Sequence, residues 1–260
     1  MIFKKIGIFD SGIGGLSLVK KLLTIPGLEL VYYADTAHVP YGNRSKEEIQ
    51  QLSYSAIQFL VEQQVDAVII ACHTASTNAL DYLKERFPTI YFIDVVELII
   101  NQTRLYSPKK IGILGTHATI ASGIHKNLLL RTLPECEIIT QECPQLASAI
   151  ETDYANQTYL PELVKNYCKP LIDGSVDAVL LACTHYSLIQ PVIMQAFNYP
   201  IQLISAEHGL QKKLKPFTDF SLTNVSTLKM HSTAHHDDFI TKTQMIICPL
   251  SLNIIQAQIL

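Results

Sequence analysis

An α/β fold of two pseudo-symmetric lobes, each built on a parallel sheet, is predicted by this sequence of 260 residues. The segment Val65–Ser76 reappears with few changes as Val176–Ser187, and Lys5-Ile-Gly-Ile reappears as Lys110-Ile-Gly-Ile. Short β-branched runs also alternate with helix-like patterns throughout, which is typical of parallel sheets covered by helices on both faces. The duplication places a cysteine after one strand of each half, so we expect a site in the cleft between the lobes.

Each expected strand is a short apolar run that ends near polar or small residues. These runs are Lys5–Phe9, Leu30–Ala34, Ala67–Ala71, Tyr91–Ile93, Ile111–Leu114, Glu137–Thr140, Ala178–Leu181 and Ile201–Ile204. The clearest helix starts at Ser45, because Ser45 and Glu48 have the spacing of a capping box and apolar residues follow at helical intervals. Another helix, Leu16–Leu23, is expected to end before Pro26-Gly27.

The repeat predicts the division of the chain into lobes. Residues 1–95 together with 206–260 form the first lobe, and residues 96–205 form the second. The tail carries no motif, although Leu222–Met230 and Thr243–Leu260 have β-branched and apolar character. We expect the tail to return to the first lobe.

Composition favours a small polar substrate over a large partner. The net charge of −3 gives no broad basic surface for nucleic acid, and the apolar runs are shorter than the roughly 18 residues of a membrane span. The first residues lack a secretory apolar segment, so we expect a cytoplasmic protein. Its six cysteines include no Cys-x-x-Cys pair, which argues against disulfides and a metal site.

Polar and small residues follow most of the predicted strands, where ligands of open parallel sheets bind. Hydroxyls and backbone amides at helix starts suit a substrate with carboxylates. The groups after strands are Asp10-Ser11-Gly12-Ile13-Gly14-Gly15, Asp35-Thr36, Tyr41-Gly42, Cys72-His73-Thr74, Gly115-Thr116 with Thr119, and Cys183-Thr184-His185.

A dinucleotide site is the competing interpretation of the glycine loop, since Asp35 follows at the spacing of a ribose-binding acid. The pattern fails because Ser17 occupies the place of the third glycine. Asp10 would also put a carboxylate beside a pyrophosphate.

The repeated cysteines, Cys72 and Cys183, are candidates for reactive thiols, because each lies where a strand gives way to a helix and a helix N-terminus favours thiolate. A single buried cysteine is more often an inert apolar residue, and that interpretation holds for the others, Cys136, Cys143, Cys168 and Cys248. His185 is expected to be an acid/base partner of Cys183. His73 is open between a structural and a functional role, and the remaining histidines are expected at the surface.

Taken together, five motifs resemble those of the glutamate racemases of the aspartate/glutamate racemase superfamily. They are Asp-Ser-Gly-Ile-Gly-Gly at 10–15, Pro40-Tyr41-Gly42, Ala71-Cys72-x-Thr74-Ala75-Ser76, Gly115-Thr116-x-x-Thr119 and Cys183-Thr184-His185-Tyr186. The resemblance spans residues 5 to 205 and implies a cofactor-independent racemase that makes D-glutamate for peptidoglycan, commonly a homodimer. Since Asp10 lies so near Met1, we expect activity without a cell-wall-precursor activator.

The resemblance implies roles for particular residues. Cys72 and Cys183 correspond to the catalytic cysteines, Cys72 acting on the D-enantiomer and Cys183 on the L-enantiomer. Asp10 corresponds to the acid that assists Cys72, and His185 to the group that assists Cys183. Glu151 follows a Cys-Pro-x-Leu stretch that resembles the one before the family's catalytic glutamate. Carboxylates near the thiols should raise the pKa of a thiol, so we expect them to relay protons. The implied substrate-binding residues are Asp10, Ser11, Tyr41, Gly42, His73, Thr74, Thr116, Thr119, Thr184 and His185.

Two residues depart from the family pattern. Ser187 replaces a usual proline, which affects only the entry into a helix. His73 replaces a usual asparagine; if it binds substrate, affinity should change with pH between about 5.5 and 7.5, around the ordinary pKa of histidine. This departure keeps open a related racemase or isomerase acting on aspartate or hydantoin. A two-lobed protein that binds an amino acid without chemistry is the alternative from another class.

Overall fold

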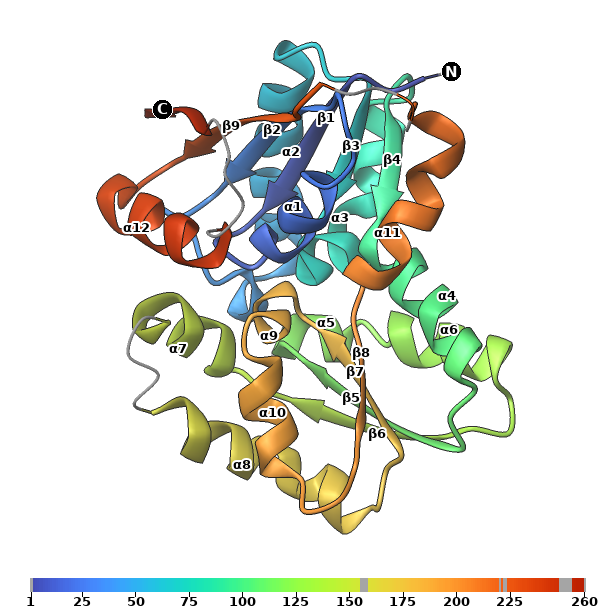
Figure 1. Ribbon diagram of the computed structural model, residues 1–260. Coiled ribbons are helices and arrows are strands. Elements are labelled where there is room, and N and C mark those ends of the chain that lie inside the picture. Colours follow the sequence, from blue (N-terminus) through green and yellow to red (C-terminus); the bar gives the residue numbers. More distant parts are fainter. Residues whose placement is uncertain (1, 155–158, 220, 222–223, 248–253, 260) are drawn as a thin grey trace.

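The structure, a computed structural model, describes residues 2–154, 159–219, 221, 224–247 and 254–259. Two lobes, each with a parallel sheet flanked by helices, lie one above the other in Figure 1. The first sheet has the order β10-β9-β2-β1-β3-β4 and the second the order β6-β5-β7-β8. The strands are β1 (Lys5–Asp10), β2 (Glu29–Ala34), β3 (Ala67–Ile70), β4 (Tyr91–Asp94), β5 (Lys110–Gly115), β6 (Glu137–Glu142), β7 (Ala178–Ala182), β8 (Gln202–Ile204), β9 (Thr227–Ser232) and β10 (Ile254–Ile259).

The predicted α/β class is confirmed, and all eight predicted strands are present. The duplication is visible in the order of the strands, because β2-β1-β3-β4 in one sheet corresponds to β6-β5-β7-β8 in the other. It extends to single hydrogen bonds: Asp66 accepts from the backbone N–H of Lys4 and Lys5, and Asp177 accepts from that of Lys109 and Lys110. The two halves therefore share strand order and the contacts that start their central strands.

Helices cover both faces of the two sheets. They are α1 (Leu16–Leu22), α2 (Lys46–Glu62), α3 (His73–Arg86), α4 (Val95–Tyr106), α5 (His117–Ala121), α6 (Ile124–Thr132), α7 (Leu146–Asp153), α8 (Leu160–Asp173), α9 (Thr184–Ser187), α10 (Gln190–Ala196), α11 (Glu207–Leu214) and α12 (His236–Ile247), with short 3-10 helices η1 (Tyr41–Asn43) and η2 (Lys215–Phe217). The capping box predicted for α2 is confirmed, because Ser45 Oγ accepts from the Glu48 N–H and the Glu48 carboxylate accepts from the Ser45 N–H.

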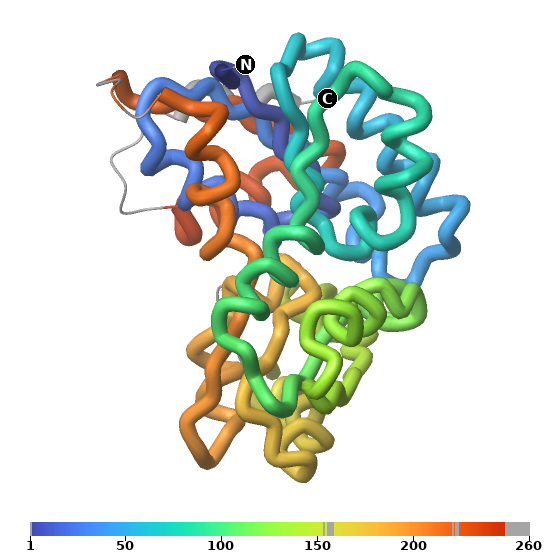
Figure 2. The backbone as a smooth tube through the Cα atoms, turned by 90° about the vertical axis from the view of Figure 1, so that its right-hand side faces the viewer, coloured from blue at the N-terminus to red at the C-terminus, as the bar shows by residue number. Residues whose placement is uncertain are grey.

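The chain passes between the lobes through α4 and again between β8 and α11, as Figure 2 shows in green and orange. Buried aliphatic side chains continue from the first sheet through α4 into the second, including Ile8, Ile99 and Ile113. The lobes thus share apolar packing next to the polar groups at their strand ends. The exact boundaries of the predicted lobes stay a prediction.

The tail adds elements that its sequence did not predict clearly. β9 pairs in parallel with β2, and β10 pairs with β9, so these strands extend the first sheet. Between these two strands in the sequence lies α12, which includes residues 243–247. Part of the segment noted for its β-branched and apolar character, residues 243–247, is therefore helical. Residues 222–223, 248–253 and 260 lie outside the described part. No described helix is long and apolar enough to cross a membrane.

Candidate active site

The order of each sheet brings the predicted residues together. In both sheets the chain reverses its direction of winding between the central strand and its neighbour, β1 with β3 and β5 with β7, which is where such sheets bind ligands. Ser11 and Cys72 follow the first pair of strands, and Thr116 and Cys183 follow the second. Because the lobes face each other at these ends, all four residues line one cavity.

The two thiols lie on opposite lobes of this cavity. Cys72 is the N-cap residue of α3, with Sγ 3.7 Å from Ser11 Oγ. Cys183 is the N-cap residue of α9, with Sγ 3.7 Å from His185 Nδ1. Burial, followed by the charge of Asp10, raises the pKa of Cys72 to about 12. The start of α3 therefore does not overcome desolvation, and Cys72 is a thiol at neutral pH.

His185 and Glu151 form a buried pair beside Cys183. His185 Nε2 lies 2.6 Å from Glu151 Oε1, and the His185 side chain is 3% exposed. Burial alone would lower the pKa of His185, but its contacts with Cys183 and Glu151 outweigh burial and raise it well above the ordinary value. A protonated imidazole next to the Cys183 sulfur can exchange a proton with it.

The glycine loop after β1 ties the two lobes together at the site. Glu151 Oε1 accepts from the Ile13 N–H at 2.7 Å, and the Asp10 carboxylate accepts from the Thr184 hydroxyl at 2.9 Å. A Cβ on Gly12 would lie 1.7 Å from Glu151 Oε1, so only glycine permits this approach. Burial, the largest cause, raises the pKa of Asp10 from 3.8 to about 6, although His185 opposes this.

Hydroxyl groups from both lobes meet at the other end of the cavity. Thr74 Oγ1 lies 2.9 Å from Thr116 Oγ1 and 3.2 Å from Thr119 Oγ1. Thr74 is also in the first turn of α3, whose N-terminus favours anions. Tyr41 and Gly42 line the cavity, and the Tyr41 hydroxyl donates to Asp35 at 2.6 Å. The cluster of hydroxyls from Thr74, Thr116 and Thr119 offers donors to a carboxylate.

The predicted residues therefore converge. Those lining the cavity are Ser11, Tyr41, Gly42, Cys72, His73, Thr74, Thr116, Cys183, Thr184 and His185. Asp10, Thr119 and Glu151 lie behind this lining and are hydrogen-bonded to it. The space open to the centre of a water molecule is only about 10 Å³, room for about one water, so substrate entry requires the site to open.

Two histidines that the sequence analysis placed at the surface are buried. His125 and His231 are 2% and 3% exposed, although both were expected at the surface. His125 packs against His73, which departs from the family pattern, with His73 Nδ1 3.0 Å from His125 Nε2. Burial, and then His125, lower the pKa of His73 well below its ordinary value. This environment favours the neutral form of His73 and does not support the pH dependence of substrate affinity that was expected around its ordinary pKa.

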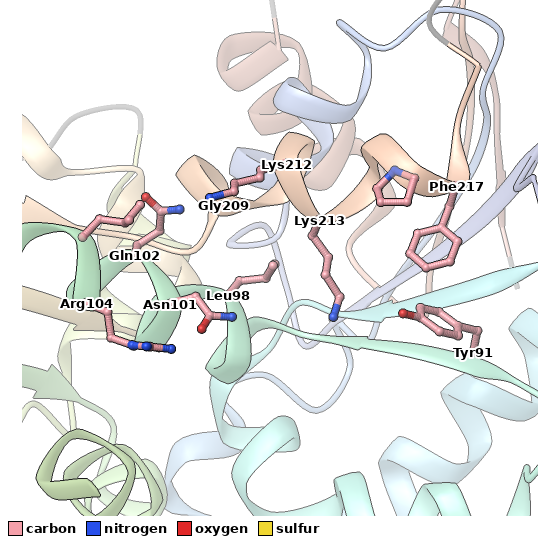
Figure 3. A pocket seen from close by; sticks show the side chains of 11 residues that line it. Tyr91, Leu98, Asn101, Gln102, Arg104, Gly209, Lys212, Lys213 and Phe217 are labelled. Atoms are coloured by element: carbon pink, nitrogen blue, oxygen red, sulfur yellow. The ribbon is translucent and has the colours of Figure 1, made fainter. Parts of the chain in front are cut away.

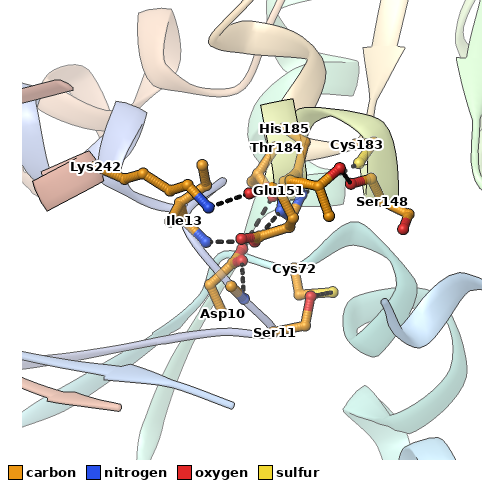
Figure 4. Close-up of polar contacts among 12 residues, drawn as sticks. Asp10, Ser11, Ile13, Cys72, Ser148, Glu151, Cys183, Thr184, His185 and Lys242 are labelled. Carbon is orange, nitrogen blue, oxygen red and sulfur yellow. Dashed lines mark hydrogen bonds and ion pairs between the residues drawn. The ribbon is translucent and has the colours of Figure 1, made fainter. Parts of the chain in front are cut away.

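Lys242, in the tail, is a site residue that the sequence interpretation missed. Figure 4 shows its ammonium group reaching the backbone carbonyl of Glu151, to which it donates. It also contacts Asp238 at 2.5 Å, and its side chain is only 8% exposed. No local pattern in α12 indicates the contact with Glu151, because Glu151 lies in the other lobe.

A larger cavity, of about 660 Å³, lies away from the two thiols. Figure 3 shows it between α4 and α11, where it is lined by Leu98, Gln102, Lys213 and their neighbours. Neither thiol lines it. Within the described ranges, no group of three or more His, Cys, Asp or Glu side chains could hold a metal ion.

Two thiols facing one cavity between two duplicated α/β lobes agree with the amino-acid racemase that the sequence motifs predict. The sequence model of the Asp/Glu/hydantoin racemase family matches residues 18–207. The chain belongs to this family. It is similar to the glutamate racemase of Aquifex aeolicus, with 37% identity covering 82% of this chain and 83% of that protein. It is also similar to that of Prochlorococcus marinus (strain NATL2A), with 32% identity covering 86% and 84%.

Solved structures agree with this assignment. The glutamate racemase of Francisella tularensis, in complex with D-glutamate, superposes with a TM-score of 0.86 and 28% identity, covering 99% of this chain and 97% of that one. The aspartate racemase of Picrophilus torridus gives a TM-score of 0.54 at 21% identity, covering 82% and 94%, and so shares the fold. The structural similarity is therefore greater to this glutamate racemase than to this aspartate racemase.

Proposed function

We propose that this enzyme interconverts L- and D-glutamate by proton transfer between its two cysteines. The observation that carries the proposal is that Cys72 and Cys183, from opposite lobes, line one cavity. In the L-to-D direction, Cys183 Sγ takes the Cα proton and the Cys72 thiol delivers its own proton to the opposite face. One Cα–H bond breaks and another forms, so no redox partner is needed. The reverse direction exchanges the two roles.

The protonation states support this direction of transfer. Cys72, with its pKa raised to about 12, is ready to donate a proton. In the D-to-L direction it must first lose that proton, and Asp10, whose pKa is about 6, is the carboxylate placed to relay it. His185, hydrogen-bonded to both Cys183 and Glu151, serves the second thiol in the same way.

The substrate carboxylates are bound by donors at the strand ends. Thr74 and Thr116 supply hydroxyls from the two lobes, and the N-terminus of α3 adds backbone amides. Negative charge that develops at the α-carboxylate during proton removal is stabilised by such fixed donors. The hydroxyls of Thr74, Thr116 and Thr119 provide a position for one carboxylate of glutamate.

The test is a racemase assay with each enantiomer of glutamate and of aspartate, paired with calorimetry. We expect optical rotation to decay to zero with both glutamate enantiomers and little turnover of aspartate. Binding of glutamate without loss of optical rotation would identify a binding protein instead. Faster turnover of aspartate would move the enzyme to the aspartate side of the family.

Three accompanying assignments belong to this proposal. The enzyme forms a homodimer. Sedimentation equilibrium tests this: twice the mass of one chain is expected, and the mass of a single chain would contradict it.

It works in the cytoplasm, where thiols stay reduced. Its product feeds peptidoglycan synthesis, so depletion should be rescued by external D-glutamate.

Lys242→Met should lower kcat/KM for glutamate by about 10-fold, because a charge-assisted hydrogen bond that holds the end of α7 and Glu151 is lost. Lys242→Arg should retain most activity. Lys165→Met, at an exposed position of α8, is the matched control. Equal activity of the Met and Arg variants would show that Lys242 does not position Glu151.

A further inference from the structure

A hydrogen bond between two histidines connects the lobes behind the cavity. His73 starts α3 in the first lobe, and His125 lies in α6 in the second. Their nitrogens, His73 Nδ1 and His125 Nε2, are 3.0 Å apart, and the ring planes are tilted by 36°. Both side chains are buried, and His73 lines the cavity that holds the two thiols. His125 thus contacts the site through His73.

Both rings are neutral at the pH where the enzyme works. Burial lowers the pKa of His125 to about 4, and burial, followed by the neighbouring ring, lowers that of His73 well below its ordinary value. A neutral imidazole carries one N–H and one bare nitrogen. One histidine must therefore donate to the other, and the choice decides which nitrogen of His73 carries its proton.

The surroundings of His125 decide between the two arrangements. Its Nδ1 is buried and has no hydrogen-bond partner among the described residues. A buried N–H without a partner is rarer than an unpaired acceptor. The proton of His125 therefore belongs on Nε2, where it is donated to His73 Nδ1. His73 accepts on Nδ1 and carries its own proton on Nε2.

We propose that His125 is a positioning residue that fixes His73 as an Nε2–H donor for a carboxylate of the bound amino acid. This inference rests on the proposed function. A neutral N–H donor can replace the amide donor of an asparagine, the residue usual at this position in the family the sequence resembles. The donor persists across the physiological pH range because neither ring titrates there. His73 and His125 together thus provide the N–H donor that the asparagine of the family pattern provides alone.

Nitrogen NMR of the full-length enzyme labelled with ¹⁵N-histidine tests the tautomer directly. We expect His73 Nε2 to show the shift and coupling of a protonated nitrogen, and Nδ1 those of a bare one. A proton on Nδ1 would overturn the proposal. D-glutamate should then shift the His73 Nε2 signal, and no change at saturating D-glutamate would also overturn it. The tautomer is read without substrate, so it stands apart from the racemase assay.

Two substitutions separate positioning from packing. His125→Leu removes the donor, so KM for glutamate should rise roughly 10-fold with kcat changed less than about twofold. His125→Gln keeps an N–H donor and should restore most of the affinity. His208→Leu, outside the cavity, should leave both constants unchanged. Equal KM values for the Leu and Gln variants would overturn the proposal, and if the Leu variant does not fold, the NMR result on the unmodified enzyme decides.

Discussion

Cys72→Ser and Cys183→Ser are each expected to lower kcat/KM for racemisation by at least about 10³-fold in both directions. A hydroxyl is a far weaker acid than a thiol, so serine does not form the anion that would remove the Cα proton. Both thiols line the same cavity, and serine is close to cysteine in size, so the fold should persist. Steady-state assays from each enantiomer measure the loss.

One-sided chemistry should survive in these variants. An analogue of glutamate with a leaving group on nitrogen needs only one base, because removal of the Cα proton expels the group and leaves an imine. Cys183→Ser should process the D-analogue through Cys72, and Cys72→Ser the L-analogue through Cys183. Cys136→Ser, at a buried thiol outside the cavity, is the control and should racemise normally. Loss of both analogue reactions in both variants would contradict separate bases.

Asp10→Asn is the second large change, and its effects on activity and stability have opposite signs. Activity should fall by about 10²-fold or more, because the carboxylate that serves Cys72 is lost. Stability at pH 7.5 should rise by about 1–3 kcal/mol, because the buried carboxylate is costly when ionised.

The pH dependence of this gain follows from the direction of the pKa shift. The pKa of Asp10 is raised in the folded protein, so its contribution to stability is fully present below its unfolded pKa of 3.8 and is lost as pH rises through about 6. The gain in the variant should therefore be large at pH 7.5 and small near pH 4. Denaturant unfolding at both pH values measures it, with exposed Asp173→Asn as control. Equal effects at both pH values would contradict a raised pKa.

The sequence predicted the sheets well because their signals are local and repeated. A run such as Ala178–Ala182 is apolar throughout and is buried throughout in the sheet. The capping box at Ser45 likewise depends on two residues three positions apart. The cysteines could be placed because each ends such a run, and parallel strands bring those ends together.

The sequence could not predict contacts that depend on packing between distant segments. His125 lies between Ile124 and Lys126 in a short helix, and nothing local indicates that His73 covers it. Lys242 contacts Glu151 across ninety-one positions of the chain. The β-branched character around Thr243 did not indicate a helix, yet this segment forms α12 because it buries one helical face against the first lobe.

Racemisation in heavy water tests the central claim, that the two cysteines act on opposite faces of Cα. Starting from L-glutamate, the account predicts that D-glutamate formed in the first few per cent of reaction carries deuterium at Cα, while recovered L-glutamate keeps its protium. Starting from D-glutamate, the labels should be reversed. Protium retained in the product, or deuterium appearing as fast in the recovered substrate as in the product, would show that one group serves both faces and would contradict the two-cysteine mechanism.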